Sequence, residues 1–203
     1  MLITAVEPRR KGLSALFLDG EFAGNIDTET LLRSGLRPGR EIDDDRLHEL
    51  VLASDNRRAG EKALYLLEHR NHSQKELADK ISRVTTREAA EAAAQHMAEL
   101  GLVNDGEYAR NLAADLFRRK GYSASRVRRE LLQKGIGEEL VQQILDEKAP
   151  DPVEKIRELL DKKYGRLLGD EKGRRRSIAA LQRLGYGWDD IRAAINQFEN
   201  EDE

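Results

Sequence analysis

The chain repeats itself at intervals of 50 residues, and this periodicity limits the folds that it can adopt. Residues of the same kind return at that interval in the series Ser73, Leu77 and Ile81, then Ser123, Val127 and Leu131, then Leu181. Within each interval, apolar residues follow the i, i+3, i+4 spacing of amphipathic helices. Stacked helical units of this kind contact mainly their neighbours. We therefore predict a mostly α protein, an elongated array of three tandem three-helix repeats.

The first 45 residues have a different pattern from the rest of the chain. Short apolar runs rich in β-forming residues flank Asp19-Gly20, a pair suited to a type I′ hairpin turn. This pattern predicts a small β-rich N-terminal subdomain, which needs the following helices as a packing partner because so few strands are marginally stable alone. The expected organisation is a subdomain at 1–45 and three-helix repeats at 46–103, 104–149 and 150–203, the last with an acidic tail.

Composition excludes several classes of protein. None of the 203 residues is a cysteine, so disulfide bonds and thiolate chemistry are excluded. Charged residues make up 36% of the chain, which indicates a large solvated surface. No apolar run approaches the roughly 20 residues of a membrane-spanning helix. We expect a cytoplasmic monomer with no membrane segment.

No group of residues has the pattern of a catalytic site. His69 and His72 could share a helix face, but no further metal ligands accompany them, and we interpret both as exposed residues at a helix end. Ser73 and Ser123 each precede a helical segment without a base to activate them, which favours a role as helix N-caps. Glycine-rich phosphate-binding motifs are absent. We therefore expect no enzyme activity, no cofactor and no metal.

A basic segment lies in the middle of this acidic chain. The formal net charge is −3, yet residues 116–136 carry seven basic side chains and one acidic side chain. A second basic run occupies the equivalent part of the third repeat, with no acidic residue between 172 and 188. Such runs suit phosphate groups or an acidic protein surface, whereas an ordinary solvated helix face is the alternative. The candidate interaction residues are Arg118, Arg119, Lys120, Arg126, Arg128, Arg129, Lys134, Lys172, Arg174, Arg175, Arg176 and Arg183.

A helical wheel separates the side chains of the first basic run. Ala124, Val127 and Leu131 share an apolar face, and Arg126 and Arg129 lie on the opposite face. This arrangement predicts that both arginines point away from the core.

Two segments of the sequence resemble the RecX family of bacterial regulatory proteins. They are "ALYLLEHRNHSQKELADKI" and "LGLVNDGEYARNLAADLFRRKGYSASRVRRELLQKGI", and the resemblance covers residues 60–148 well and the third repeat more loosely. "LFLDGEFAGNID" is similar to the β-containing extension of some members. Ser123 departs from the family pattern, in which many relatives have glycine.

The resemblance implies a fold of tandem three-helix repeats and a non-enzymatic function. Family members bind the RecA recombinase filament on DNA and inhibit its ATP hydrolysis, strand exchange and co-protease activity. This activity connects the family with DNA repair, homologous recombination and the SOS response. The basic segment would then face the groove of the filament and meet acidic RecA surfaces, with DNA phosphates as a further candidate partner.

Two other functions stay open at this point. Residues 123–145 could form a helix-turn-helix that reads DNA, although the would-be recognition helix, "EELVQQILDEK", is acidic. A helical-repeat scaffold that binds only proteins is the second alternative. Base preference on bare DNA would favour the helix-turn-helix, and the absence of any effect on RecA filaments would favour the scaffold.

Overall fold

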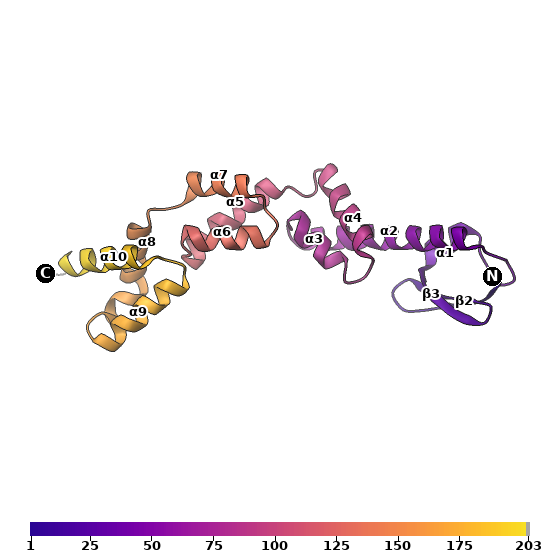
Figure 1. The fold of residues 1–203 in the computed structure, drawn as a ribbon, viewed down its shortest axis with the longest axis horizontal. Coiled ribbons are helices and arrows are strands. Elements are labelled where there is room, and N and C mark those ends of the chain that lie inside the picture. The colour runs from indigo at the N-terminus through magenta and orange to yellow at the C-terminus, as the bar shows by residue number, and fades with distance from the viewer. Residues whose placement is uncertain (202–203) are drawn as a thin grey trace. The chain divides into compact units, whose positions relative to one another are not determined.

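The structure is a computed structural model that describes residues 1–201 (Figure 1). The last two residues of the expected acidic tail, 202 and 203, lie outside the described residues. The described chain contains three strands and ten α-helices. It divides into two compact units, Met1–Asn104 and Asp105–Glu203. The prediction of a mostly α protein with a small β-containing start is confirmed.

A three-stranded antiparallel sheet begins the first unit. Its strands follow one another in sequence order and are β1 (Ile3–Pro8), β2 (Leu13–Leu18) and β3 (Glu21–Asp27). Asp19 and Gly20, between β2 and β3, have φ angles of 51° and 89°. A type I′ turn requires a positive φ at both central positions, so the predicted hairpin is confirmed.

The sheet packs against two helices that follow it, α1 (Thr28–Ser34) and the 26-residue α2 (Asp44–His69). Their shared core contains Ile3, Leu16, Ile26, Leu31 and Leu50. Three short strands could not bury this apolar surface by themselves. The expectation that the N-terminal subdomain packs on the following helices is therefore confirmed.

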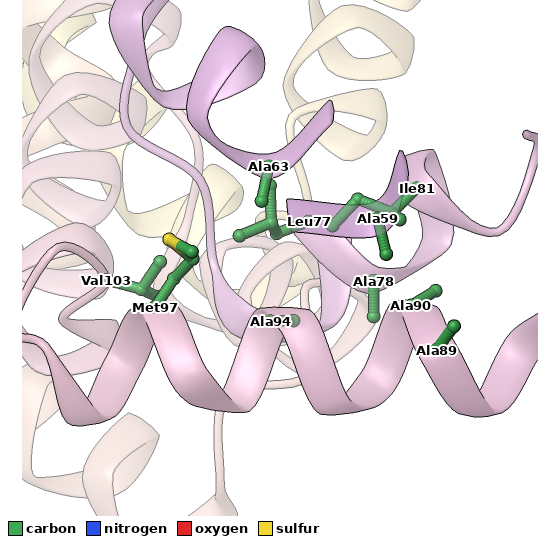
Figure 2. Close-up of a cluster of buried hydrophobic side chains, with 10 residues drawn as sticks. All are labelled: Ala59, Ala63, Leu77, Ala78, Ile81, Ala89, Ala90, Ala94, Met97 and Val103. Carbon is green, nitrogen blue, oxygen red and sulfur yellow. The ribbon is translucent and has the colours of Figure 1, made fainter. Parts of the chain in front are cut away.

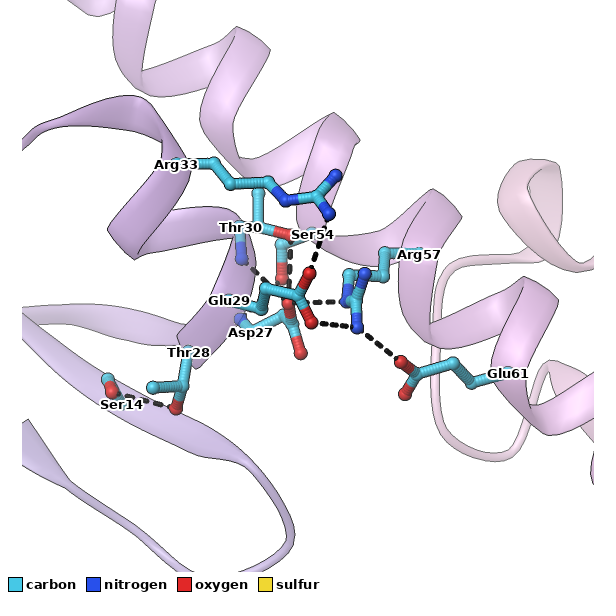
Figure 3. Close-up of polar contacts among 9 residues, drawn as sticks. All are labelled: Ser14, Asp27, Thr28, Glu29, Thr30, Arg33, Ser54, Arg57 and Glu61. Atoms are coloured by element: carbon cyan, nitrogen blue, oxygen red, sulfur yellow. Dashed lines mark hydrogen bonds and ion pairs between the residues drawn. The ribbon is translucent and has the colours of Figure 1, made fainter.

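An ion-pair network fastens the end of β3 to α2 (Figure 3). Arg57 of α2 pairs with Asp27 at 3.0 Å, with Glu61 at 2.7 Å, and with Glu29. The backbone N–H of Asp27 donates to the Ser54 hydroxyl at 2.8 Å, in a buried position. These contacts fix the sheet relative to α2, because Asp27 belongs to β3 and its partners belong to the helix.

The first repeat combines α2 with α3 (Gln74–Ile81) and α4 (Arg87–Glu99). Figure 2 shows its core, in which Ala90 and Ala94 of α4 face Leu77 and Ala78 of α3. Alanine side chains are short, so α4 can lie close to its neighbours. Ser73 caps α3 by accepting a hydrogen bond from the N–H of Glu76 at 3.1 Å, which confirms the predicted N-cap.

The second repeat begins with α5 (Asp105–Asp115), which continues into a π-helical turn, η1 (Leu116–Lys120). Its other helices are α6 (Ala124–Gln133) and α7 (Glu138–Lys148). Ser123 caps α6 through the N–H of Arg126 at 3.3 Å. The predicted course of residues 116–136, a helix end, a short joint and a second helix, is confirmed.

The third repeat begins with α8 (Pro152–Leu159), a π-helical turn η2 (Leu160–Tyr164) and a 3-10 turn η3 (Gly165–Leu167). It ends with α9 (Glu171–Arg183) and α10 (Trp188–Glu201). Residues at the 50-residue interval occupy matching core positions, since Ile81, Leu131 and Leu181 are all 0% exposed. The repeat that the sequence indicates is thus a repeat of buried positions.

Candidate interaction surface

The two basic runs meet at a groove within the second unit. The groove has a volume of about 370 Å³, and α6 and α9 supply its walls. Its lining residues are Arg126, Arg129, Glu130 and Gln133 from α6 and Gln182 and Arg183 from α9. We call this feature the α6–α9 groove. Arginines from two basic runs that are far apart in the sequence therefore line one groove. Of the twelve candidate interaction residues, only Arg126, Arg129 and Arg183 are among its lining residues.

Hydrogen bonds to the backbone hold the two walls together. The N–H of Ser123 donates to the carbonyl oxygen of Leu184 at 3.0 Å, and the hydroxyl of Ser125 donates to the carbonyl oxygen of Gly185 at 2.9 Å. Tyr186 donates its phenolic O–H to the carbonyl oxygen of Gly121 at 3.2 Å. Because every bond runs between the second repeat and the third, the groove is a fixed feature of the unit.

The close approach of the walls depends on Gly185. Its φ of 97° lies in the left-handed region that favours glycine. A Cβ at this position would lie 2.5 Å from the hydroxyl of Ser123 and 2.8 Å from the Cβ of Arg126. Both distances are far below a van der Waals contact, so a larger residue would separate the walls.

Arg126 contacts the third repeat, a neighbour that the helical wheel of α6 does not include. Its side chain is 29% exposed, and its Nη1 donates to the carbonyl oxygen of Arg183. Its guanidinium lies 4.0 Å from the centre of the Tyr122 ring, within the range of cation–π contacts. A helical wheel represents only the core of one repeat, so it could not show that the opposite face meets the next repeat.

Two arginines of the groove are available for a ligand. Arg129 and Arg183 are exposed, and neither guanidinium has a hydrogen-bond or ion-pair partner among the side chains described, those of residues 1–200. An unpaired guanidinium can form a charge-assisted, bidentate contact with a carboxylate or phosphate without first breaking an existing pair. Lys120, Lys172 and Arg176 are exposed and unpaired in the same way in the described chain, but they do not line the groove.

The other candidate residues already have partners. Arg118 and Arg119 both lie near Asp115, at 3.4 and 3.6 Å. The remaining ion pairs are Arg128 with Glu138, Arg174 with Glu199 at 2.6 Å, and Arg175 with Glu171 at 2.9 Å. Lys134 is half-buried at the end of α6. The charge available to a partner is therefore smaller than the number of basic residues indicates.

Several residues at the groove were not identified from the sequence. Gln182 lines it, and Ser125 and Tyr186 hold its walls together. The sequence does carry one signal for this region: "KGIG" at 134–137 and "LGYG" at 184–187 lie 50 residues apart, which marks an equivalent turn in the two repeats. That spacing does not indicate which side chains cross between repeats.

A second cleft, of about 440 Å³, lies in the first unit beside α1 and α2. Arg33, Arg46 and Arg57 line it, but each already pairs with a nearby carboxylate. The cleft therefore offers apolar walls and neutralised arginines, and it does not resemble an anion site.

His72 is buried, so its interpretation as an exposed residue at a helix end was wrong. It is 2% exposed, and its Nδ1 lies 3.2 Å from Oε2 of Glu76. Burial, aided by the nearby charge of Arg70, lowers the pKa of His72 below its ordinary value. His69 is exposed as expected. Among the side chains of residues 1–200, no three from His, Asp or Glu are placed to hold a metal ion together.

No helix in the described part of the chain combines the length and apolar character needed to cross a membrane.

Models of two domains from one protein family match the second unit. The model of the second three-helix domain of RecX matches residues 104–145, and the model of the third matches residues 150–195. A crystal structure of the regulatory protein RecX has the same fold, with a TM-score of 0.61 and 21% sequence identity. The similarity covers 96% of this chain and 98% of that one.

Curated relatives extend the similarity to the whole chain. The regulatory protein RecX of Caldanaerobacter subterraneus subsp. tengcongensis is 30% identical over 97% of this chain and 99% of its own length. That of Bacillus velezensis is 28% identical over 99% of this chain and 80% of its own length. With the three-helix domains and the full-length similarity in agreement, the chain belongs to the RecX family of regulatory proteins.

Proposed function

We propose that this protein is a non-enzymatic regulator that binds RecA–DNA filaments and inhibits ATP hydrolysis, strand exchange and co-protease function. Family membership supports a regulatory role. The observation that carries the proposal is the α6–α9 groove, where Arg129 and Arg183 are exposed and unpaired between fixed walls. Such a site suits the carboxylates of a protein surface or the phosphates of DNA, and a RecA–DNA filament offers both.

Inhibition follows if the protein binds one state of the filament more tightly than the others. A ligand shifts a conformational equilibrium only by the difference between its affinities for the two states. A repeat protein that contacts several RecA subunits would oppose the subunit movements that accompany ATP hydrolysis. Enzyme activity of its own is not needed for this effect.

The surface of α7 argues against the helix-turn-helix alternative. Its exposed face carries Glu138, Glu139, Asp146 and Glu147. In a helix-turn-helix protein the second helix enters the major groove, where these carboxylates would face phosphates of the same charge. Binding of bare DNA through α7 is therefore disfavoured.

We further propose that the protein acts as a cytoplasmic monomer with functional segments at 1–45, 46–103, 104–149 and 150–203. The first segment stabilises α2 through the Arg57 network and the shared apolar core. The last two segments supply the groove.

The direct test is a titration of this protein into RecA that is hydrolysing ATP on single-stranded DNA. We expect hydrolysis to fall with a saturable dependence on protein concentration, and we expect inhibition to weaken as salt rises, because exposed charges are screened over about 8 Å at physiological ionic strength. Unchanged hydrolysis throughout the titration would contradict the proposal. Strong, base-selective binding to bare DNA would instead support the helix-turn-helix alternative.

A further inference from the structure

Arg126 differs from the other basic residues of the groove because its guanidinium is already occupied. Its Nη1 donates to the carbonyl oxygen of Arg183, its planar group covers the Tyr122 ring, and its Nε lies 3.8 Å from Glu130. It is only 29% exposed. Little of this group is left for a ligand, so its contribution to the groove must come through other residues.

The contact with Arg183 connects the two available arginines. Arg129 lies three residues after Arg126 on α6, a spacing that places both on neighbouring positions of one helix surface. Arg126 donates a hydrogen bond to the carbonyl oxygen of Arg183. The position of the Arg183 backbone relative to α6 therefore depends directly on Arg126.

We infer that Arg126 is a positioning residue, which joins α6 to the end of α9 so that Arg129 and Arg183 contact one anionic group of the partner together. The inference rests on the proposed function only for the identity of that partner. Two arginines that are held in place before binding lose less conformational entropy when the partner binds. Their contributions to the binding free energy are therefore interdependent. Without the contact, the other bonds between the repeats remain, but the end of α9 is held less firmly against α6, and the contributions of Arg129 and Arg183 become more nearly independent.

The first experiment measures the walls without any partner. The chain has no cysteine, so Gln143→Cys on α7 and Asn196→Cys on α10 would accept a single pair of spin labels. Pulsed dipolar spectroscopy would then report the distances between the second and third repeats. We expect one narrow distribution in the labelled parent protein and a measurably broader one after Arg126→Met, which keeps the apolar stem but removes the donors.

Arg128→Met is the matched control. Arg128 also lies on α6, but its contacts are with Glu138 and Gln142 of the same repeat. We expect its distance distribution to equal that of the parent. If Arg126→Met does not fold by circular dichroism, Ser125→Ala tests the same interface, because it removes the bond to the carbonyl oxygen of Gly185, together with a bond to the hydroxyl of Ser123 within the second repeat.

The second experiment measures binding to RecA filaments on single-stranded DNA. Arg129→Gln and Arg183→Gln would be made singly and together, with Arg126 present and with Arg126→Met. With Arg126 present, the loss of affinity in the double variant should be smaller than the product of the single losses by about tenfold. With Arg126→Met, the single losses should multiply.

The two experiments separate the inference from the proposed function. Broadened distances after Arg126→Met, in a protein that does not bind filaments, would support the positioning role and remove RecA as the partner. Filament binding together with unchanged distances and unchanged coupling would overturn the positioning role and leave the proposed function standing.

Discussion

Tyr186 donates its phenolic O–H to the carbonyl oxygen of Gly121 at 3.2 Å, which joins the third repeat to the second. The residue is 5% exposed. Burial, with a smaller contribution from the charge of Glu158, raises the pKa of Tyr186 to about 12. The phenol therefore stays protonated, and remains a donor, well above the pH at which an ordinary tyrosine ionises.

Tyr186→Phe should lower the free energy of unfolding by about 1 kcal/mol, because the bond is lost and a buried carbonyl oxygen loses its partner. The folded state holds the Tyr186 proton between pH 10 and about 12, where the unfolded state releases it. Stability from this group is therefore present below pH 10 and is lost as the pH rises through about 12. Titration by tyrosinate absorbance should show a late-ionising tyrosine that is missing from the variant. An identical titration of both proteins would contradict this.

Leu131→Ala should destabilise the protein strongly. Leu131 is 0% exposed in the core of the second repeat, and truncation of a buried leucine costs roughly 2–5 kcal/mol. Arg129→Ala on the exposed side of α6 is the control, with an expected change within about 0.5 kcal/mol. Chemical denaturation measures both, and similar midpoints for the two variants would show that the buried face of α6 is misassigned.

Two glycines should respond in opposite directions to alanine. Gly185→Ala should destabilise the protein, because the added Cβ would lie 2.5 Å from the hydroxyl of Ser123 and the φ of 97° is unfavourable for alanine. Gly60 lies inside α2 with open space around its Cβ position, so Gly60→Ala should raise stability by about 0.8–1 kcal/mol. Melting temperatures would test both, and a stabilised Gly185→Ala variant would refute the close approach of the two repeats.

His72 should make the protein less stable in mild acid. The pKa of His72 is lowered in the folded state, so the unfolded state takes up a proton first as the pH falls below 6.5. Stability from the neutral imidazole is therefore full above pH 6.5 and is lost as the pH falls towards the folded pKa. Melting temperatures at about pH 7.5 and about pH 5.5 should differ more for the unmodified protein than for His72→Gln. Equal differences would show that another group controls the acid response.

Much of the fold follows from local sequence signals. The 50-residue interval predicts buried residues such as Ile81, Leu131 and Leu181, because a repeated core needs a repeated apolar position. Asp19-Gly20 and Ser73 act within a few residues of themselves, so their roles as turn and N-cap could be predicted.

Features that depend on residues far away in the sequence could not be predicted from local patterns. Glycine often marks a position where a helix can stop, but Gly165 has φ −57° and ψ −43° and continues into η3. A larger side chain does not fit at Gly165, because a Cβ there would lie 2.7 Å from the Phe198 ring. The segment "TTRE" has the spacing of a capping box that begins at Thr85, but the N-cap of α4 is the next residue, Thr86.

The groove shows the same division between local and distant signals. Charge and helical spacing identify Arg129 and Arg183 as basic surface residues. Only the fold shows that they share a groove and that Arg126 is turned into the contact between repeats. A count of basic residues also overstates the charge that is available to a partner, because some of these residues are already paired. Helix spacing can indicate the pair of Arg118 with Asp115, but only the fold shows the pair of Arg174 with Glu199.

The central claim is that the α6–α9 groove binds the RecA filament, and the most direct test reverses its two unpaired arginines. Arg129→Glu with Arg183→Glu would be compared with Arg166→Glu and Arg192→Glu, two exposed arginines of the same unit that do not line the groove. Both pairs change the net charge equally. The concentration needed to halve RecA ATP hydrolysis should rise at least about tenfold for the groove pair, since like charges facing each other in an interface can cost several kcal/mol. It should change little for the control pair. Equal inhibition by the two folded variants would contradict the claim.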